Sequence, residues 1–162
     1  IILHPDPRLK KTSEPVTELT DDLRVLAKDM LETMYAAPGR GLAAPQVGVL
    51  SRMFVVDTDW KEAAPAPQVF INPEIVARSA PKAVQSEGCL SIPGVTADVA
   101  RPDNVVLRWT DVDGVVQESA FSGFAAACVQ HELDHLDGIV TLDPLDATDR
   151  ARVVAAYEDL HS

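Results

Sequence analysis

Cysteine is scarce in this chain, which has only Cys89 and Cys128 among its 162 residues. Two thiols in a chain of this size do not make the disulfide framework of a small secreted domain. We therefore expect reduced thiols in a cytosolic compartment, where either one could be a metal ligand or a nucleophile.

Basic residues and long apolar runs are scarce as well. The chain has 14 Lys and Arg against 25 Asp and Glu, a formal net charge of −11, which argues against DNA or anionic lipid as a partner. No run approaches the roughly 18 apolar residues of a membrane span, and no basic segment precedes a hydrophobic one at the N-terminus. We expect a cytoplasmic protein. An organellar location stays open, because the chain begins at Ile1 and a leader could precede it.

The apolar fraction of 46% is enough for one buried core. At this length we expect a single domain over residues 1–162. Strands and helices do not alternate as βαβ units, so the expected fold class is α+β. It would consist of mostly antiparallel sheets packed around a central helix, with a C-terminal helix.

Turn residues and hydrophobic spacing predict the elements around that central helix. Helices are expected from a Thr20 cap to about Met34 and from a Thr148 cap to about Leu160. The expected extended segments are residues 1–3, 53–57, 69–71 and 75–76, and a hairpin of 104–109 with 115–121.

The segment that carries chemistry is Gln-His-Glu-Leu-Asp-His at residues 130–135. In a helix, His131 and His135 are about 40° apart around the axis and roughly 6 Å apart along it, so they can bind one metal ion. Glu132 lies beside the first histidine, where its carboxylate can act on a bound water instead of the metal. This division of roles is typical of hydrolysis. The alternative is a chance pair of histidines with a solvated glutamate.

A helix over residues 123–137 is predicted from both ends of this segment. Ser122 is a plausible N-cap and Gly138 suits the position just after the helix. The alanine-rich stretch between them favours helix.

A catalytic metal site needs a third protein ligand. The candidates are Cys89, Cys128, His4, His161 and several acids. Cys128 lies on the histidine face, but the three residues would span about 10.5 Å of one straight helix, too far for one ion. We expect it to be a small wall residue. Cys89 follows Gly88 on a loop or irregular strand and can approach the helix from outside, although a buried structural thiol is the commoner role for its residue type.

The stretch Leu42–Gly48 is rich in small residues and contains one amide side chain, Gln46. Small residues let a backbone approach a ligand closely. It does not fit a phosphate loop, since no lysine follows the glycines. It is either a connecting loop or part of a ligand site.

Three separated blocks resemble the peptide deformylase family. They are GRGLAAPQVG at residues 39–48, EGCLS at 87–91 and QHELDH at 130–135. Together they are far more specific than the histidine motif alone, and the likeness covers nearly the whole chain. It implies an enzyme that removes the formyl group from N-formylmethionine at the start of newly made polypeptides. The implied partners are these nascent peptides and, transiently, the ribosome.

The resemblance assigns a metal ligand set of Cys89, His131 and His135. It implies one divalent ion per chain, with Fe²⁺ expected and Zn²⁺, Ni²⁺ or Co²⁺ able to occupy the site. A metal lowers the pKa of its bound water, and the resulting hydroxide would attack the formyl carbon with Glu132 as general base and acid.

The resemblance also assigns the groups that hold the substrate. The developing oxyanion would be bound by the metal, the Gln46 amide and the Leu90 backbone N–H. The residues implied to contact the peptide or its methionine side chain are Gly41, Gly88, Phe124, Ala127 and Cys128.

Three positions depart from the family pattern. Arg40 stands where the family usually has Ile or Val, Thr96 where many relatives have Arg or Tyr, and Ala127 where a larger aliphatic residue is usual. None is a ligand or the general base, so they bear on substrate preference.

Two rival hypotheses remain: a small zinc peptidase using the same helix, and a metal-stabilised binding domain without catalysis.

Overall fold

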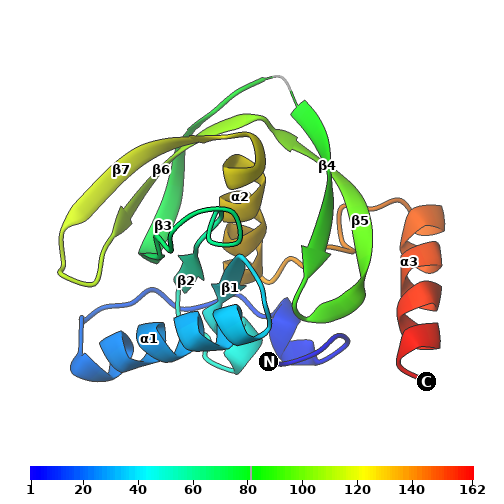
Figure 1. The fold of residues 1–162 in the computed structure, drawn as a ribbon, viewed down its shortest axis with the longest axis horizontal. Helices are drawn as coiled ribbons and strands as arrows, with labels where there is room; N and C mark the ends of the chain where they lie inside the picture. Colours follow the sequence, from blue (N-terminus) through cyan, green and yellow to red (C-terminus); the bar gives the residue numbers. More distant parts are fainter. Residues whose placement is uncertain (81) are drawn as a thin grey trace.

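The computed structural model describes residues 1–80 and 82–162. Helix α2 (Gly123–Leu136) lies at its centre, between a five-stranded sheet on one side and a two-stranded hairpin on the other (Figure 1). Helix α1 (Asp21–Ala36) packs on the first strands of the sheet, and α3 (Ala147–Leu160) packs beside the hairpin. The expected α+β class, with antiparallel sheets around a central helix, is confirmed.

The five-stranded sheet is antiparallel throughout and has the order β1-β2-β3-β6-β7. Its strands are β1 (Gly41–Ala43), β2 (Met53–Val56), β3 (Gln68–Arg78), β6 (Asn104–Thr110) and β7 (Val116–Ser122). The two extended segments predicted around Asn72 form one strand with an irregular register at that point. Asn72 has φ of 50° there, and its side-chain amide exchanges two hydrogen bonds with the Val16 backbone.

The two-stranded hairpin consists of β4 (Lys82–Cys89) and β5 (Ile92–Pro102). Its regular register joins Lys82 to Pro102 and Gly88 to Thr96, and shifts at Cys89. The hairpin therefore ends with Cys89 beside the tight turn at residues 90–91. This hairpin positions one half of the candidate site against α2.

Three apolar clusters fix these elements. The first lies between α2 and the sheet and contains Val129, Leu133 and Leu136 from the helix. The second joins α1 to β1 and β2, and the third joins α3 to β5. On the opposite side of α2, buried polar side chains such as His131, Glu132 and His135 face the hairpin.

Thr20 and Ser122 precede α1 and α2 as predicted, although α1 continues two residues past Met34 and the Ser122 side chain makes no capping hydrogen bond. The Thr20 hydroxyl accepts from Leu23 N–H at 3.2 Å, and Gly138 follows α2 with φ of 73°. The predicted cap of the last helix was wrong, because α3 begins two residues earlier with Asp146, whose carboxylate accepts from Asp149 N–H. Residues 1–3 form no strand. Ile2 N–H donates a single bond to the Gln46 carbonyl, without a ladder.

In the part of the chain that the structure describes, no helix is long and apolar enough to cross a membrane.

Candidate active site

Cys89, His131 and His135 come together as a group that could hold a metal ion, with all three ligand atoms within 4.8 Å of one another. Cys89 Sγ lies 3.4 Å from His135 Nε2, which lies 3.2 Å from His131 Nε2. Tetrahedral ligands at about 2.0–2.3 Å from an ion are roughly 3.3–3.7 Å apart. The donor set therefore fits a divalent cation.

The sulfur of this group comes from the hairpin and the two imidazoles from the helix. Cys128, the other thiol, contacts the Arg40 carbonyl oxygen at 3.8 Å instead. Burial, reinforced by the Glu132 carboxylate, raises the pKa of the Cys128 thiol well above its usual value. Cys128 is thus a neutral wall residue, as its helical position predicted.

A buried charged cluster holds His131 from behind. His131 Nδ1 lies 3.0 Å from Glu87 Oε1, and Arg101 donates to both oxygens of Glu87 at 2.7 and 3.0 Å. Arg101 also donates to Asp134 Oδ2 at 2.8 Å. Because its Nδ1 is engaged, His131 presents Nε2 to the other two ligand atoms. The sequence analysis missed Glu87, Arg101 and Asp134.

Burial and neighbouring charges together shift the pKa values of Glu87 and His135. Burial would raise the pKa of Glu87, but the hydrogen bonds from His131 and Arg101 outweigh it and lower that pKa. Burial, with the neighbouring His131, lowers the pKa of His135 well below its usual value. A neutral imidazole is the form that binds a metal.

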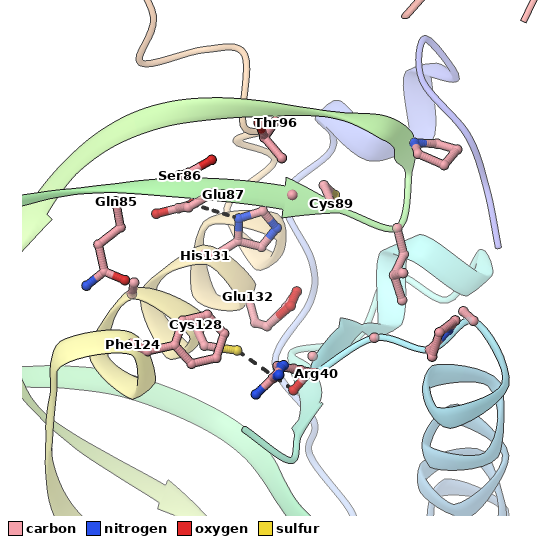
Figure 2. Close-up of a pocket in the computed structure, with 18 of the residues that line it drawn as sticks. Arg40, Gln85, Ser86, Glu87, Cys89, Thr96, Phe124, Cys128, His131 and Glu132 are labelled. Atoms are coloured by element: carbon pink, nitrogen blue, oxygen red, sulfur yellow. Dashed lines mark hydrogen bonds and ion pairs between the residues drawn. The ribbon is translucent and has the colours of Figure 1, made fainter. Parts of the chain in front are cut away.

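Glu132 projects from α2 toward the same point (Figure 2). It is 2% exposed, and its Oε1 has no hydrogen-bond partner among residues 1–80 and 82–162. Burial raises its pKa to about 7. Gly41 leaves it room, because a Cβ at that position would lie 2.7 Å from Glu132 Oε2. The result is a buried carboxyl group beside the ligand atoms, with one oxygen unpaired among the described residues.

Gln46 and Leu90 bring two more segments to this point. Gln46 lies on the short helix η2 (Ala44–Val47), and its Oε1 accepts from Ala43 N–H at 2.9 Å. Its Nε2 donates to Ser91 Oγ at 3.0 Å and lies 3.6 Å from Cys89 Sγ. Leu90 lies in the turn directly after Cys89. The Gln46 amide is therefore fixed, with its NH₂ group toward the candidate ligands.

A cavity of about 490 Å³ opens over these groups. Gly41, Gly88, Phe124, Ala127 and Cys128, the residues predicted to contact the substrate, all line it. Phe124 is 48% exposed. All three positions that depart from the family pattern line the cavity, since Arg40 and Thr96 join Ala127 there. Gln85, which the sequence analysis did not single out, lines it as well.

The arrangement has the parts that hydrolysis of a small carbonyl compound requires. A trio of ligand atoms can hold a Lewis acid, and a carboxyl group with a free oxygen can move a proton. Fixed N–H donors can bind a developing oxyanion. The open cavity gives a substrate access to all of them.

Comparisons with known proteins agree with this geometry. The family model described as polypeptide deformylase matches residues 1–151. The peptide deformylase of Afipia carboxidovorans is 49% identical over 157 residues, covering 97% of this chain and 92% of the relative.

Solved structures give the same answer at the level of the fold. The crystal structure of a peptide deformylase from Legionella pneumophila superposes with a TM-score of 0.93 at 37% identity, covering 99% of this chain and 94% of that one. The Synechococcus elongatus enzyme in complex with actinonin has a TM-score of 0.93 at 36% identity, with 98% and 86% covered. The chain therefore belongs to the polypeptide deformylase family.

Proposed function

We propose that this protein removes the formyl group from N-formylmethionyl peptides by metal-dependent hydrolysis, releasing formate. The observation that carries the proposal is that Cys89, His131 and His135 lie together, beside the Glu132 carboxyl group and at an open cavity. Family membership supplies the substrate class. Formyl is the smallest acyl group, so a reactive centre this closely surrounded by protein can still reach it.

Cys89, His131 and His135 would hold one divalent ion. Fe²⁺ is the proposed native metal, with Zn²⁺, Ni²⁺ or Co²⁺ as substitutes, because a mixed thiolate and imidazole set suits all four. When bound, the ion supplies Lewis acidity and lowers the pKa of a coordinated water. A thiolate ligand exposes the site to oxidation, so activity of the iron form should decline on aeration.

Glu132 is the proposed general base and acid. Its buried carboxyl group, with Oε1 unpaired among the described residues, can accept a proton from the attacking water and return it to the leaving amine. Burial favours this exchange, because it brings the pKa of Glu132 to about 7.

Gln46 Nε2–H and the Leu90 backbone N–H are the proposed donors to the oxyanion. Gln46 is suited to this because Ala43 fixes the orientation of its amide. Such preorganised donors need no rearrangement as charge develops.

Gly41 and Gly88 are proposed to flank the substrate main chain, and Phe124, Ala127 and Cys128 its first side chain. All five line the cavity. The glycines leave the peptide room for close backbone contact, and the three α2 residues provide an apolar wall.

We further propose that residues 1–162 form one catalytic domain, because α2 contacts both the sheet and the hairpin. N-formylmethionyl nascent chains are its proposed partners, with transient association at the ribosome and a cytoplasmic location. Neither DNA nor a membrane is a proposed partner, in keeping with the net charge of −11.

Formate release tests this function. Protein purified without oxygen and loaded with Fe²⁺ or Ni²⁺ should release formate from formyl-Met-Ala-Ser and leave Met-Ala-Ser intact. Cleavage of the unformylated peptide between residues would instead support a zinc peptidase. Metal binding without any turnover would support a non-catalytic binding domain.

A further inference from the structure

The side chain of Arg40, the residue before β1, is held at the cavity by several contacts. Its Nη1 donates to Glu62 Oε2 at 3.0 Å and to the Thr58 carbonyl oxygen, and its Nη2 donates to Glu62 Oε1 at 2.6 Å. Its guanidinium carbon lies 5.4 Å from the centre of the Phe124 ring. With a side chain that is 25% exposed, Arg40 is a fixed part of the cavity wall and does not extend freely into solvent.

These contacts leave part of the guanidinium group unused. A guanidinium group has five N–H donors, and the contacts with Glu62 and Thr58 occupy three of them. Within residues 1–80 and 82–162, the Nε–H and one Nη2–H have no partner. The side-chain amide of Gln85, on β4, also lines the cavity without a hydrogen bond to the described residues.

Figure 2 shows Phe124, Cys128 and Arg40 close together below His131 and Glu132, with Gln85 across from Arg40. The part of the cavity over α2 is therefore apolar at Phe124 and Ala127 and polar at Arg40 and Gln85. An apolar side chain bound there would displace water from the polar groups without replacing its hydrogen bonds. A side chain with an oxygen acceptor would replace them.

The charge of the wall decides which kind of acceptor fits. Glu62 forms a bidentate ion pair with Arg40. The hydrogen bonds of this pair raise the pKa of the guanidinium, so Arg40 remains protonated and its charge is balanced by Glu62. Glu132 lies in the same cavity. A carboxylate at this position would compete with Glu62 for the Arg40 guanidinium, whereas a neutral amide or sulfoxide oxygen needs only the donors that Glu62 and Thr58 leave free.

We propose that Arg40 is a specificity-determining residue that lets the cavity accept an unbranched first side chain with a neutral hydrogen-bond acceptor near its end. Glutamine and methionine sulfoxide are such side chains, taken in addition to methionine. The inference rests on the proposed deformylation, since the side chain in question is that of the formylated residue.

The test compares four peptides that differ only in their first residue: formyl-norleucine, formyl-methionine, formyl-methionine sulfoxide and formyl-glutamine, each followed by Ala-Ser. The measured quantity is kcat/KM of the metal-loaded protein. In Arg40→Leu, the ratio of the glutamine or sulfoxide peptide to the norleucine peptide should fall by about tenfold, as expected for loss of a hydrogen bond to a charged group. Arg108→Leu is the matched control, because it removes an exposed Arg–Glu pair on β6 and β7. It should leave the ratio unchanged.

An unchanged ratio in Arg40→Leu overturns the inference. A second measurement covers the case in which this variant does not fold. The unformylated peptides Gln-Ala-Ser and norleucine-Ala-Ser are tested as competitive inhibitors of the unaltered protein, and the glutamine peptide should bind more tightly. Equal inhibition also overturns the inference. Failure to hydrolyse any of the four formyl peptides rejects the proposed function itself, so the two failures are distinguishable.

Discussion

The two sides of α2 are both buried but depend on different forces. Toward the sheet, Val129 and Leu136 are fully covered by apolar neighbours. Toward the β4–β5 hairpin, His131, Glu132 and His135 are between 1% and 9% exposed, yet carry groups that prefer water. Burial alone stabilises the first side. On the second side His131 is paired with Glu87 and both histidines can bind a metal, whereas Glu132 Oε1 has no partner among the described residues and is free to act on a substrate.

The largest expected effect on the polar side of α2 comes from removing Glu132, the proposed proton carrier. Glu132→Ala should lower kcat by about 10²- to 10⁴-fold, because proton transfer to and from the reacting groups is lost. Metal content should stay at one ion per chain, since the three ligand atoms remain. Rates from formate release and metal content from elemental analysis check this together. Unaltered turnover would contradict the assigned role.

A substitution on the apolar side of α2 should lower the free energy of unfolding and leave the metal site unchanged. Leu107, on β6, is fully buried in the cluster that covers α2. Leu107→Ala should lower the free energy of unfolding by about 2–5 kcal/mol, because it removes buried methyl groups and leaves a cavity. Urea denaturation measures this, with Val116→Ala as a control at a position 64% exposed. The folded variant should keep its metal affinity, and a parallel loss of affinity would show that the two sides are not separate.

Gly41, the first residue of β1, lies against Glu132 on the polar side of α2. The new methyl group of Gly41→Ala would approach Glu132 Oε2 to 2.7 Å, so the carboxyl group must move. A displacement of about 1 Å in a catalytic group can cost roughly 100-fold in rate. We expect a fall of about that size in kcat, with little change in melting temperature because the close contacts are with one side chain and not with backbone. A large loss of stability with normal kcat in the folded fraction would argue against it.

The smallest expected effect comes from the cluster behind His131. Glu87→Gln weakens the partner of His131 Nδ1 and leaves Asp134 as the remaining charged partner of Arg101 among residues 1–80 and 82–162. Loss of such an outer partner typically costs about 10- to 100-fold in metal affinity. Competition with a chelator measures this. Glu118→Gln, which alters an exposed pair with Arg108, should leave the affinity unchanged.

The sequence predicted the helix side of the site well, because the information is local. The spacing of His131 and His135, the Thr20 cap of α1 and the glycine at 138 depend only on residues within a few positions of each other. The same reasoning failed where two caps compete. Asp146 and Thr148 are both suitable residues, and in the structure it is the Asp146 carboxylate that accepts from the free N–H of Asp149.

The hairpin side could not be predicted in this way. Residues 82–102 show little of the β-branched alternation that marks a strand, and the sequence analysis expected only a loop or irregular strand at Cys89. Glu87 and Arg101 lie on opposite strands of the hairpin, where the register pairs them with Ala97 and Ala83, and the Arg101 side chain reaches Glu87 from 14 positions away in the sequence. One signal was available. Glu87 stands two positions before Cys89, so on a strand both would face the same side.

The most direct test of the account is X-ray absorption at the edge of the bound metal in anaerobically loaded protein. We predict one ion per chain with one sulfur ligand and two imidazole nitrogens, and loss of the sulfur signal in Cys89→Ser. An ion bound without sulfur, or with its sulfur retained in Cys89→Ser, would contradict the claim that helix and hairpin together form the metal site.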